Sequence, residues 1–169
     1  MRIIITEDKR ERLIDNFLSE EYGGLIRYEP KNRPDLIFFV KDTKKEPINC
    51  IHPSAIISTK KIGNGNLICP NSVIHVDAYI GDCTIINTGS IVEHDCYVDS
   101  FSQISPNVTL CGYVKIGESS FISASSTIIP NIKIGHNSTV AAGSVVIEDV
   151  PSNVMVAGVP SKIKKYYKL

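Results

Sequence analysis

The residues best suited to acid–base chemistry lie around His94. It is the one of the four histidines in the chain that stands between two carboxylates, in the run Glu93-His94-Asp95. A hydrogen-bonded carboxylate holds the tautomer of an imidazole and raises its basicity, so we consider His94 a candidate general base. We interpret the other three histidines as one turn residue and two surface residues: His52, His75 and His136.

A second candidate, Gly112, follows His94 by eighteen residues. Eighteen residues are one full coil of the repeat described below, so we expect Gly112 directly above the histidine. A glycine clears space for a ligand and leaves a backbone N–H for a carbonyl oxygen. A base beside an amide donor is what acyl transfer to an amine or a hydroxyl requires. The residues leave the choice between these two acceptor atoms open.

The elements that must position these residues are indicated by a period of six. Every sixth residue from Ile62 to Val146 is aliphatic, at fifteen positions without an insertion. The register extends back, more loosely, through Ile56 and Cys50. The residue directly after each aliphatic is often glycine, and the fourth residue after each aliphatic is usually small. Six fits neither a 3.6 nor a 3.5 period, which argues against helices.

This unit of six resembles the hexapeptide repeat of left-handed parallel β-helices. In that fold three hexads form the three flat faces of a prism, and successive coils stack about 4.8 Å apart. We therefore predict a mainly β protein, a left-handed parallel β-helix over residues 50–151. Its faces carry few charges, and we expect them to pack in a homotrimer.

The two ends of the chain do not follow the repeat. Residues 1–49 are interpreted as a small α/β N-terminal unit, with strands at Arg2–Thr6 and Leu36–Val40 and a helix reaching about Glu20. Residues 152–169 are interpreted as an exit segment and a basic tail, since their last part carries four lysines and no acid.

Composition excludes several classes of protein. Eighteen basic residues balance eighteen acidic ones, so no overall field attracts nucleic acid or an anionic membrane surface. No apolar stretch is long enough to span a bilayer, and the first residues lack a secretory signal. Five cysteines without a CxxC motif suit reduced thiols. We therefore expect a cytoplasmic protein with no nucleic-acid partner and no membrane span.

Two motifs carry a resemblance to a known family. The segment from Asn87 to Gly112, with SIVEHDCYVDSFSQISPNVTLCG, and the closing VAGVPSK are similar to hexapeptide-repeat sugar acetyltransferases. The relevant group contains the sialic acid O-acetyltransferases and the bacillosamine-pathway N-acetyltransferases, and the resemblance covers about residues 48–162. It implies acetyl-CoA-dependent transfer to an amino or hydroxyl group of a sugar or nucleotide-sugar in surface-polysaccharide synthesis. It also implies trimers with sites between neighbouring prisms.

The resemblance assigns roles around the motif. His94 falls on the general base, and Asp95 on the acid that increases its basicity. Asn87 falls on the residue that helps to position the acceptor. The amide of Gly112 falls on the donor that receives the acetyl carbonyl. The implied mechanism is direct attack of the acceptor on the thioester, without a covalent acetyl-enzyme or a metal.

The resemblance also implies where acetyl-CoA binds. The coenzyme A arm is expected along a groove between subunits near Ala124 and Ala142, with Lys162 close to its nucleotide end. Many relatives carry a second histidine nine residues after the base, in the pattern FSHVS. This chain has Gln103 there, which keeps a hydrogen-bonding role toward acetyl-CoA and excludes a titrating one.

The N-terminal unit departs from the family. The relatives carry a fuller Rossmann-like unit that holds the nucleotide-sugar with a glycine-rich turn, whereas the unit here is truncated. Glu7-Asp8 stands where a pyrophosphate would need glycines and exposed amides. We therefore predict that residues 1–49 bind a nucleotide-sugar weakly or not at all.

Two other functions fit the sequence less well. A metal enzyme similar to the γ-class carbonic anhydrases needs converging histidines, two of them five residues apart, but Asp99 and Ala141 occupy those places after His94 and His136. The other alternative is a non-catalytic β-helix that serves as a scaffold. The Glu93-His94-Asp95 run with Gly112 above it argues against that alternative.

Overall fold

The computed structural model describes residues 49–167 and two short strands before them, β1 (Leu25–Arg27) and β2 (Ile37–Phe39). These two strands pair antiparallel. β2 falls within the strand predicted at Leu36–Val40, and β1 was not predicted. The strand predicted at Arg2–Thr6 and the helix after it lie outside the described residues.

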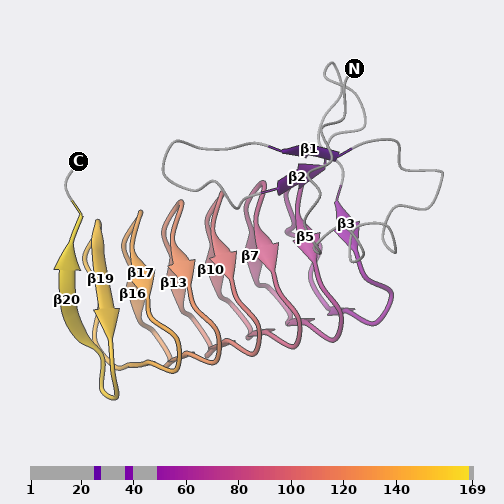
Figure 1. The fold of residues 1–169 in the computed structure, drawn as a ribbon. Coiled ribbons are helices and arrows are strands. Elements are labelled where there is room, and N and C mark those ends of the chain that lie inside the picture. Colours follow the sequence, from indigo (N-terminus) through magenta and orange to yellow (C-terminus); the bar gives the residue numbers. More distant parts are fainter. Residues whose placement is uncertain (1–24, 28–36, 40–48, 168–169) are drawn as a thin grey trace.

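From Cys50 to Val146 the chain forms sixteen strands of two residues each, stacked into coils (Figure 1). Consecutive strands of one coil are joined by short turns and belong to different sheets. Among these sixteen strands, therefore, none pairs with its neighbour in sequence. Their bounds are β3 Cys50–Ile51, β4 Ile56–Ile57, β5 Leu67–Ile68, β6 Val73–Ile74, β7 Tyr79–Ile80, β8 Ile85–Ile86, β9 Ile91–Val92, β10 Tyr97–Val98, β11 Gln103–Ile104, β12 Thr109–Leu110, β13 Lys115–Ile116, β14 Phe121–Ile122, β15 Thr127–Ile128, β16 Lys133–Ile134, β17 Thr139–Val140 and β18 Val145–Val146.

The strands form three parallel sheets, which are the faces of the prism. The six-stranded sheet runs β4-β6-β9-β12-β15-β18, and the four-stranded sheet runs β7-β10-β13-β16. The eight-stranded sheet begins β3-β5-β8-β11-β14-β17. Wherever two of the strands from β5 to β18 pair with each other, the paired residues are eighteen positions apart, as in Tyr97 with Lys115. The predicted coil of eighteen residues is confirmed, and the period of six fits a left-handed parallel β-helix.

The first coil departs from this register. Cys50 pairs with Leu67 and Ile57 with Ile74, seventeen residues apart in both cases. Ile56 is 61% exposed, whereas Ile57 packs against the core. The predicted extension of the inward positions through Ile56 and Cys50 is therefore wrong by one residue. The reason is that Ile62 follows Ile57 by five positions, not six.

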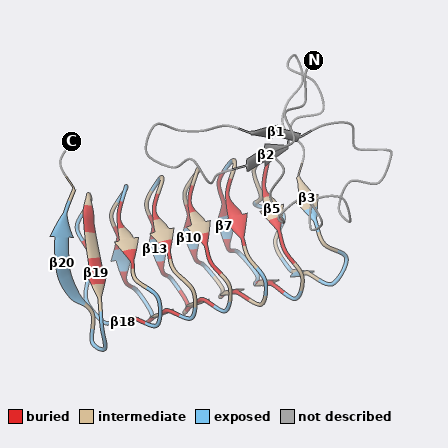
Figure 2. Cartoon of the chain, viewed as in Figure 1, coloured by how far each residue is buried: buried red, intermediate tan, exposed pale blue. Residues whose placement is uncertain are grey.

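The core is a column of inward aliphatic residues, and Figure 2 marks buried residues in red on successive coils. Every sixth residue from Ile68 to Val146 is at most 2% exposed. Burial of each side chain contributes about 1.5–3 kcal/mol. The small residues at the fourth position are also buried, and most of their serine hydroxyls donate to backbone carbonyls, as Ser120 Oγ does to Gly135 O at 2.8 Å. Small satisfied side chains let the chain turn without an unpaired polar group in the core.

The turns have a backbone requirement that repeats with the same period. Every sixth residue from Gly65 to Gly143 has a positive φ. Most of these positions hold glycine, asparagine, aspartate or serine. Three hold larger or apolar side chains: Cys83, Phe101 and Tyr113. Asparagine and aspartate are enriched in this left-handed region, whereas bulky residues there are outliers.

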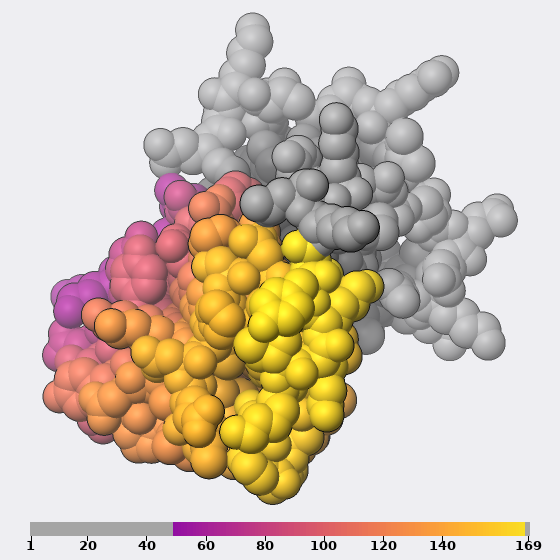
Figure 3. Space-filling model, turned by 90° about the vertical axis from the view of Figure 1, so that its left-hand side faces the viewer, coloured from indigo at the N-terminus to yellow at the C-terminus, as the bar shows by residue number. Residues whose placement is uncertain are grey.

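The C-terminal segment continues one face of the prism. β19 (Val154–Ala157) pairs in parallel with β17, and β20 (Lys162–Tyr166) pairs antiparallel with β19. The eight-stranded sheet thus extends past residue 151, and these last residues lie at one end of the molecule (Figure 3). In the part of the chain that the structure describes, no helix has the length and apolarity needed to cross a membrane.

Candidate active site

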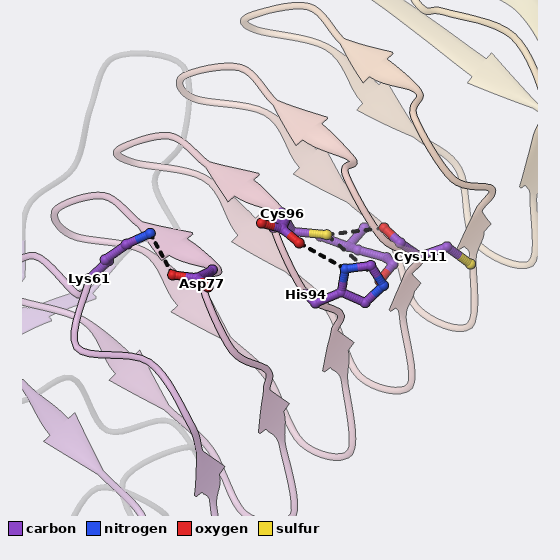
Figure 4. Close-up of polar contacts among 7 residues, drawn as sticks. Lys61, Asp77, His94, Cys96 and Cys111 are labelled. Atoms are coloured by element: carbon purple, nitrogen blue, oxygen red, sulfur yellow. Dashed lines mark hydrogen bonds and ion pairs between the residues drawn. The ribbon is translucent and has the colours of Figure 1, made fainter.

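His94 lies in the turn between β9 and β10 (Figure 4). We call the column of turns that joins the six-stranded sheet to the four-stranded sheet the His94 corner; it comprises residues 75–78, 93–96, 111–114 and 129–132. The strands on both sides are held by the buried aliphatics, so the turn is carried by a rigid scaffold. A side chain in such a turn projects from an edge of the prism, where a ligand can reach it.

Asp95 holds the imidazole of His94 from one side. His94 Nδ1 lies 2.9 Å from Asp95 Oδ2, and the two side chains are 44% and 39% exposed. The φ of Asp95 is +58°, which turns its carboxylate back toward the preceding residue. The acceptor carboxylate favours the tautomer with hydrogen on Nδ1, so Nε2 has a free lone pair. The structure therefore brings the predicted base and its acid together.

Gly112 supports the imidazole from the next coil. An ideal Cβ on this residue would lie 2.7 Å from His94 Cε1 and 2.8 Å from Nε2. Gly112 was expected above His94 and is found there, but the space over it is taken by the histidine ring itself, not left for a ligand. The Gly112 residue is buried, and its N–H donates to no acceptor among the described residues.

Two further rings surround His94, and sequence reasoning did not place either at the site. The ring centroid of His75 lies 6.4 Å away at an interplanar angle of 74°, and that of Tyr113 lies 5.3 Å away at 88°. His75 is exposed, as predicted for a surface residue, but it borders the candidate base. Each is nineteen residues from His94. A step of one coil plus one residue would have found both.

Other predicted site residues lie at a different edge. We call the turns that join the eight-stranded sheet to the six-stranded sheet the Ala124 corner; it comprises residues 69–72, 87–90, 105–108, 123–126 and 141–144. Asn87 lies here, as do Ala124 and Ala142, which are one coil apart. Within one chain the strands of the six-stranded sheet separate this corner from His94. The structure therefore does not bring Asn87, Ala124 or Ala142 to the base of the same chain.

The Ala124 corner presents several polar groups. The N–H groups of Ala124 and Ala142 donate to no acceptor among the described residues. Gln103, on β11, is half-buried and leads directly into this corner. Ser105, one coil above Asn87, was not predicted. Its buried Oγ has no hydrogen-bond partner within the described part of the chain.

Lys162 lies on β20, at the C-terminal end of the eight-stranded sheet. Its Nζ is 3.6 Å from Glu148 Oε2, and both side chains are mostly exposed. Exposed ion pairs of this kind contribute little to stability. Lys162 therefore presents an exposed positive charge at this end of the prism.

The thiols near the His94 corner are poor nucleophiles. Burial raises the pKa of Cys96 to about 11, and its Sγ donates to Cys111 O at 3.0 Å. Burial, with the charge of Glu93, also raises the pKa of Cys111, the residue before Gly112. The thiolate is the reactive form, so both side chains stay protonated and unreactive near neutral pH. Among the described residues, no three His, Cys, Asp or Glu side chains are grouped to hold a metal ion.

Residues 113–148 match the family described as bacterial transferase hexapeptide (six repeats). This part of the prism is built of hexapeptide repeats. The match lies within the prism and begins about one coil after the candidate base, which it does not include. No protein of curated function matches the chain significantly.

Solved structures give more specific similarities. The chain is 39% identical to a variant of perosamine N-acetyltransferase from Caulobacter crescentus in complex with CoA and GDP-perosamine, with a TM-score of 0.70. It is 33% identical to the acetyltransferase domain of PglB from Neisseria gonorrhoeae, also with a TM-score of 0.70. That domain is also known in complex with acetyl coenzyme A, at 32% identity. AntD, an N-acyltransferase from Bacillus cereus, is 21% identical and shares the fold.

The similarity is partial in length. The Caulobacter alignment covers 71% of this chain and 58% of the relative. The Neisseria alignment covers 72% of this chain and 60% of that domain. The chain thus spans less than two thirds of these two relatives.

Proposed function

We propose that the chain is an acetyl-CoA-dependent acetyltransferase that acts on an amino or hydroxyl group of a sugar or nucleotide-sugar in surface-polysaccharide or glycan synthesis. The observation that carries the proposal is the His94–Asp95 pair seated on Gly112 at an edge of a hexapeptide-repeat prism. The Caulobacter relative, with CoA and GDP-perosamine bound, supports this choice of substrates. The five free cysteines suit a cytoplasmic location.

In the proposed reaction His94 acts as the general base. Nε2 takes a proton from the acceptor while the acceptor nitrogen or oxygen attacks the acetyl carbonyl carbon. The bond from this carbon to the sulfur of CoA then breaks, and the leaving thiolate receives a proton from the imidazolium. Asp95 stabilises the imidazolium through its contact with Nδ1. The Gly112 N–H is the donor proposed for the acetyl oxygen as negative charge develops on it.

The proposed reaction is a direct transfer. A covalent acetyl-enzyme would need a nucleophile at the His94 corner. The thiols of Cys96 and Cys111 are held in their protonated forms by burial. A single displacement on the thioester therefore fits these side chains better than a two-step route through cysteine.

We also propose a homotrimer packed around the six-stranded sheet. The outward residues of this sheet are uncharged and partly exposed: Ile56, Val73, Ile91, Thr109, Thr127 and Val145. The four-stranded sheet instead presents lysines and tyrosines: Tyr79, Tyr97, Lys115 and Lys133. Of these two faces, the one without charges is the better candidate for a subunit interface.

This packing would complete the site. When three prisms direct one face toward a common axis, each edge of that face meets the opposite edge of the neighbour. The His94 corner of one subunit would then face the Ala124 corner of the next. Asn87, Gln103 and the unpaired hydroxyl of Ser105 would come to the acceptor and the acetyl group from the neighbouring chain.

Coenzyme A is proposed to lie in the groove between these two corners. The unpaired amides of Ala124 and Ala142 are one coil, about 4.8 Å, apart, a spacing that suits the amide groups of the pantetheine arm. Lys162, near the C-terminal end of the prism, is proposed to meet the phosphates of the nucleotide. The acceptor is proposed to enter from the side of His75.

The test is release of free CoA from acetyl-CoA, measured with a panel of nucleotide-linked amino sugars and sialic acids. Acceptor-dependent release, with product identified by mass spectrometry, is the expected result. It also decides between nitrogen and oxygen acceptors. A zero rate across the panel by a protein that also fails to bind CoA in calorimetry would favour the scaffold alternative.

A further inference from the structure

Tyr113 adopts a backbone conformation that is unfavourable for its side chain. Its φ is +64°. The equivalent positions at the His94 corner hold residues that tolerate this region well: Asp77, Asp95 and Asn131. A bulky residue there is an outlier. Such local strain persists only where the surrounding structure or the function of the site offsets it.

Comparison with Phe101 shows that burial does not offset the strain at Tyr113. Phe101 also has a positive φ, of +59°, and it packs against Ile85 in an apolar cluster with Leu67 and Cys83. Tyr113 is 52% exposed and belongs to neither apolar cluster of the described residues. Packing therefore accounts for the positive φ of Phe101 but not for that of Tyr113.

What Tyr113 contacts is the candidate base. Its ring is nearly perpendicular to that of His94, at a centroid distance of 5.3 Å. Its N–H donates to His94 O at 3.1 Å, so the backbone of the turn also joins the two residues. The edge-to-face arrangement is a favoured geometry for a pair of rings. The strained turn therefore places an aromatic side chain against the imidazole.

We propose that Tyr113 is a positioning residue for His94, an inference that rests on the function proposed above. Asp95 holds Nδ1 and Gly112 supports the ring from the next coil. Neither contact alone stops the imidazole from swinging outward into solvent. The ring of Tyr113 blocks that rotation and keeps Nε2 directed toward the acceptor. A near-attack geometry depends on this kind of restraint.

Two substitutions separate positioning from folding. Tyr113→Asn removes the ring and installs a residue that suits a positive φ, so the melting temperature should stay the same or rise. The same variant should lower kcat by about 2- to 12-fold, the range that one aromatic pair supports, with an unchanged KM for acetyl-CoA. Tyr113→Phe keeps the ring and should retain wild-type kcat.

Phe101→Asn is the matched control. It makes the same change at the same backbone position of another turn, but it removes packing against Ile85 and should lower the melting temperature. Wild-type kcat in Tyr113→Asn would overturn the proposal. A fall in kcat that accompanies a fall in melting temperature would also overturn it, because it would indicate a structural role only.

An NMR measurement keeps the test independent of the proposed function. In protein with ¹⁵N-labelled histidine, the proton on Nδ1 of His94 should give a sharp signal because Asp95 accepts it. Tyr113→Asn should broaden or remove this signal, and Tyr113→Phe should preserve it. If the protein transfers no acetyl group, the proposed function fails, and an unchanged signal in Tyr113→Asn is then the result that refutes positioning by Tyr113.

Discussion

The imidazole of His94 rests directly on Gly112, one coil further along the prism. A Cβ at Gly112 would lie within 2.8 Å of both Cε1 and Nε2 of the histidine. Real atoms do not approach so closely, so any side chain at this position must displace the ring. The absence of a side chain at Gly112 is therefore part of what holds the candidate base in place.

Gly112→Ala should displace His94 and lower kcat by roughly 10²-fold, because a misplaced base loses most of its contribution. It should also lower the melting temperature. Gly112 is not among the residues with positive φ, so an alanine there does not strain the backbone. The loss of stability should therefore come from the clash between the new methyl group and the imidazole of His94.

A double-mutant cycle measures this relationship directly. In a His94→Ala background the added methyl group meets no imidazole, so Gly112→Ala should then leave the melting temperature nearly unchanged. Equal destabilisation in both backgrounds would mean that the clash is with another part of the turn.

Gln103→Ala should raise the KM for acetyl-CoA more than it lowers kcat. The proposed role of this amide is to bind the cofactor, and a lost ground-state contact appears mainly in KM. Gln103→His should be tolerated. Steady-state kinetics at varied acetyl-CoA check both variants, and complete loss of kcat in Gln103→Ala would instead place the glutamine in the chemical step.

Thr109→Lys should convert the proposed trimer into monomers. Thr109 lies on the outward side of β12, in the middle of the uncharged six-stranded face, and three buried ammonium groups near one axis would repel each other. Light scattering measures the result. Lys115→Glu, on the next strand but on the four-stranded face, is the control and should leave the assembly intact.

The mixed trimer offers a second check of the same interface. Subunits with His94→Ala and subunits with Asn87→Ala should each be nearly inactive alone. If a site combines these residues from two chains, mixing and reassembly should restore part of the activity. No recovery, in trimers shown to exchange subunits, would place both residues in a site within one chain.

The pH dependence of stability should reflect two buried thiols. Burial raises the pKa of Cys69 and Cys96 from 9.0 to about 11. The unfolded chain therefore loses these protons at lower pH than the folded chain does. The free energy of unfolding should be unaffected by them below pH 9 and should fall between pH 9 and 11.

Each thiol should contribute a slope of at most about 1.4 kcal/mol per pH unit in that window. Denaturant titrations of wild type and Cys96→Ala measure the difference. The variant should start less stable because of the small cavity, and its slope should be shallower. Parallel curves for the two proteins would show that Cys96 ionises equally in both states.

The hexad spacing was sufficient to predict the prism because each hexad directs one large residue into the core, and that residue must be apolar. The register predicted for the first coil was wrong for a local reason. Both Ile56 and Ile57 are apolar. An apolar residue therefore stands at the expected inward position whether the step back from Ile62 is six positions or five. Here the sequence offered two equivalent registers, and only packing against Ile74 selects between them.

The site was predictable to the extent that it follows whole coils. His94 and Gly112 are separated by one coil, and Asp95 is adjacent in sequence, so the sequence predicted that these three residues lie together. His75 and Tyr113 approach His94 diagonally, one residue beyond a coil, and side-chain direction decides such contacts. Asn87 and the two alanines belong to another edge of the prism, so their relation to the base depends on a neighbouring subunit.

The most direct test is the turnover of His94→Ala, measured as CoA release with saturating acetyl-CoA and the acceptor identified by the panel. We predict a decrease of roughly 10²–10⁴-fold, with CoA affinity in calorimetry unchanged and a smaller loss in Asp95→Asn. Turnover close to wild type in His94→Ala would contradict the assignment of His94 as the general base.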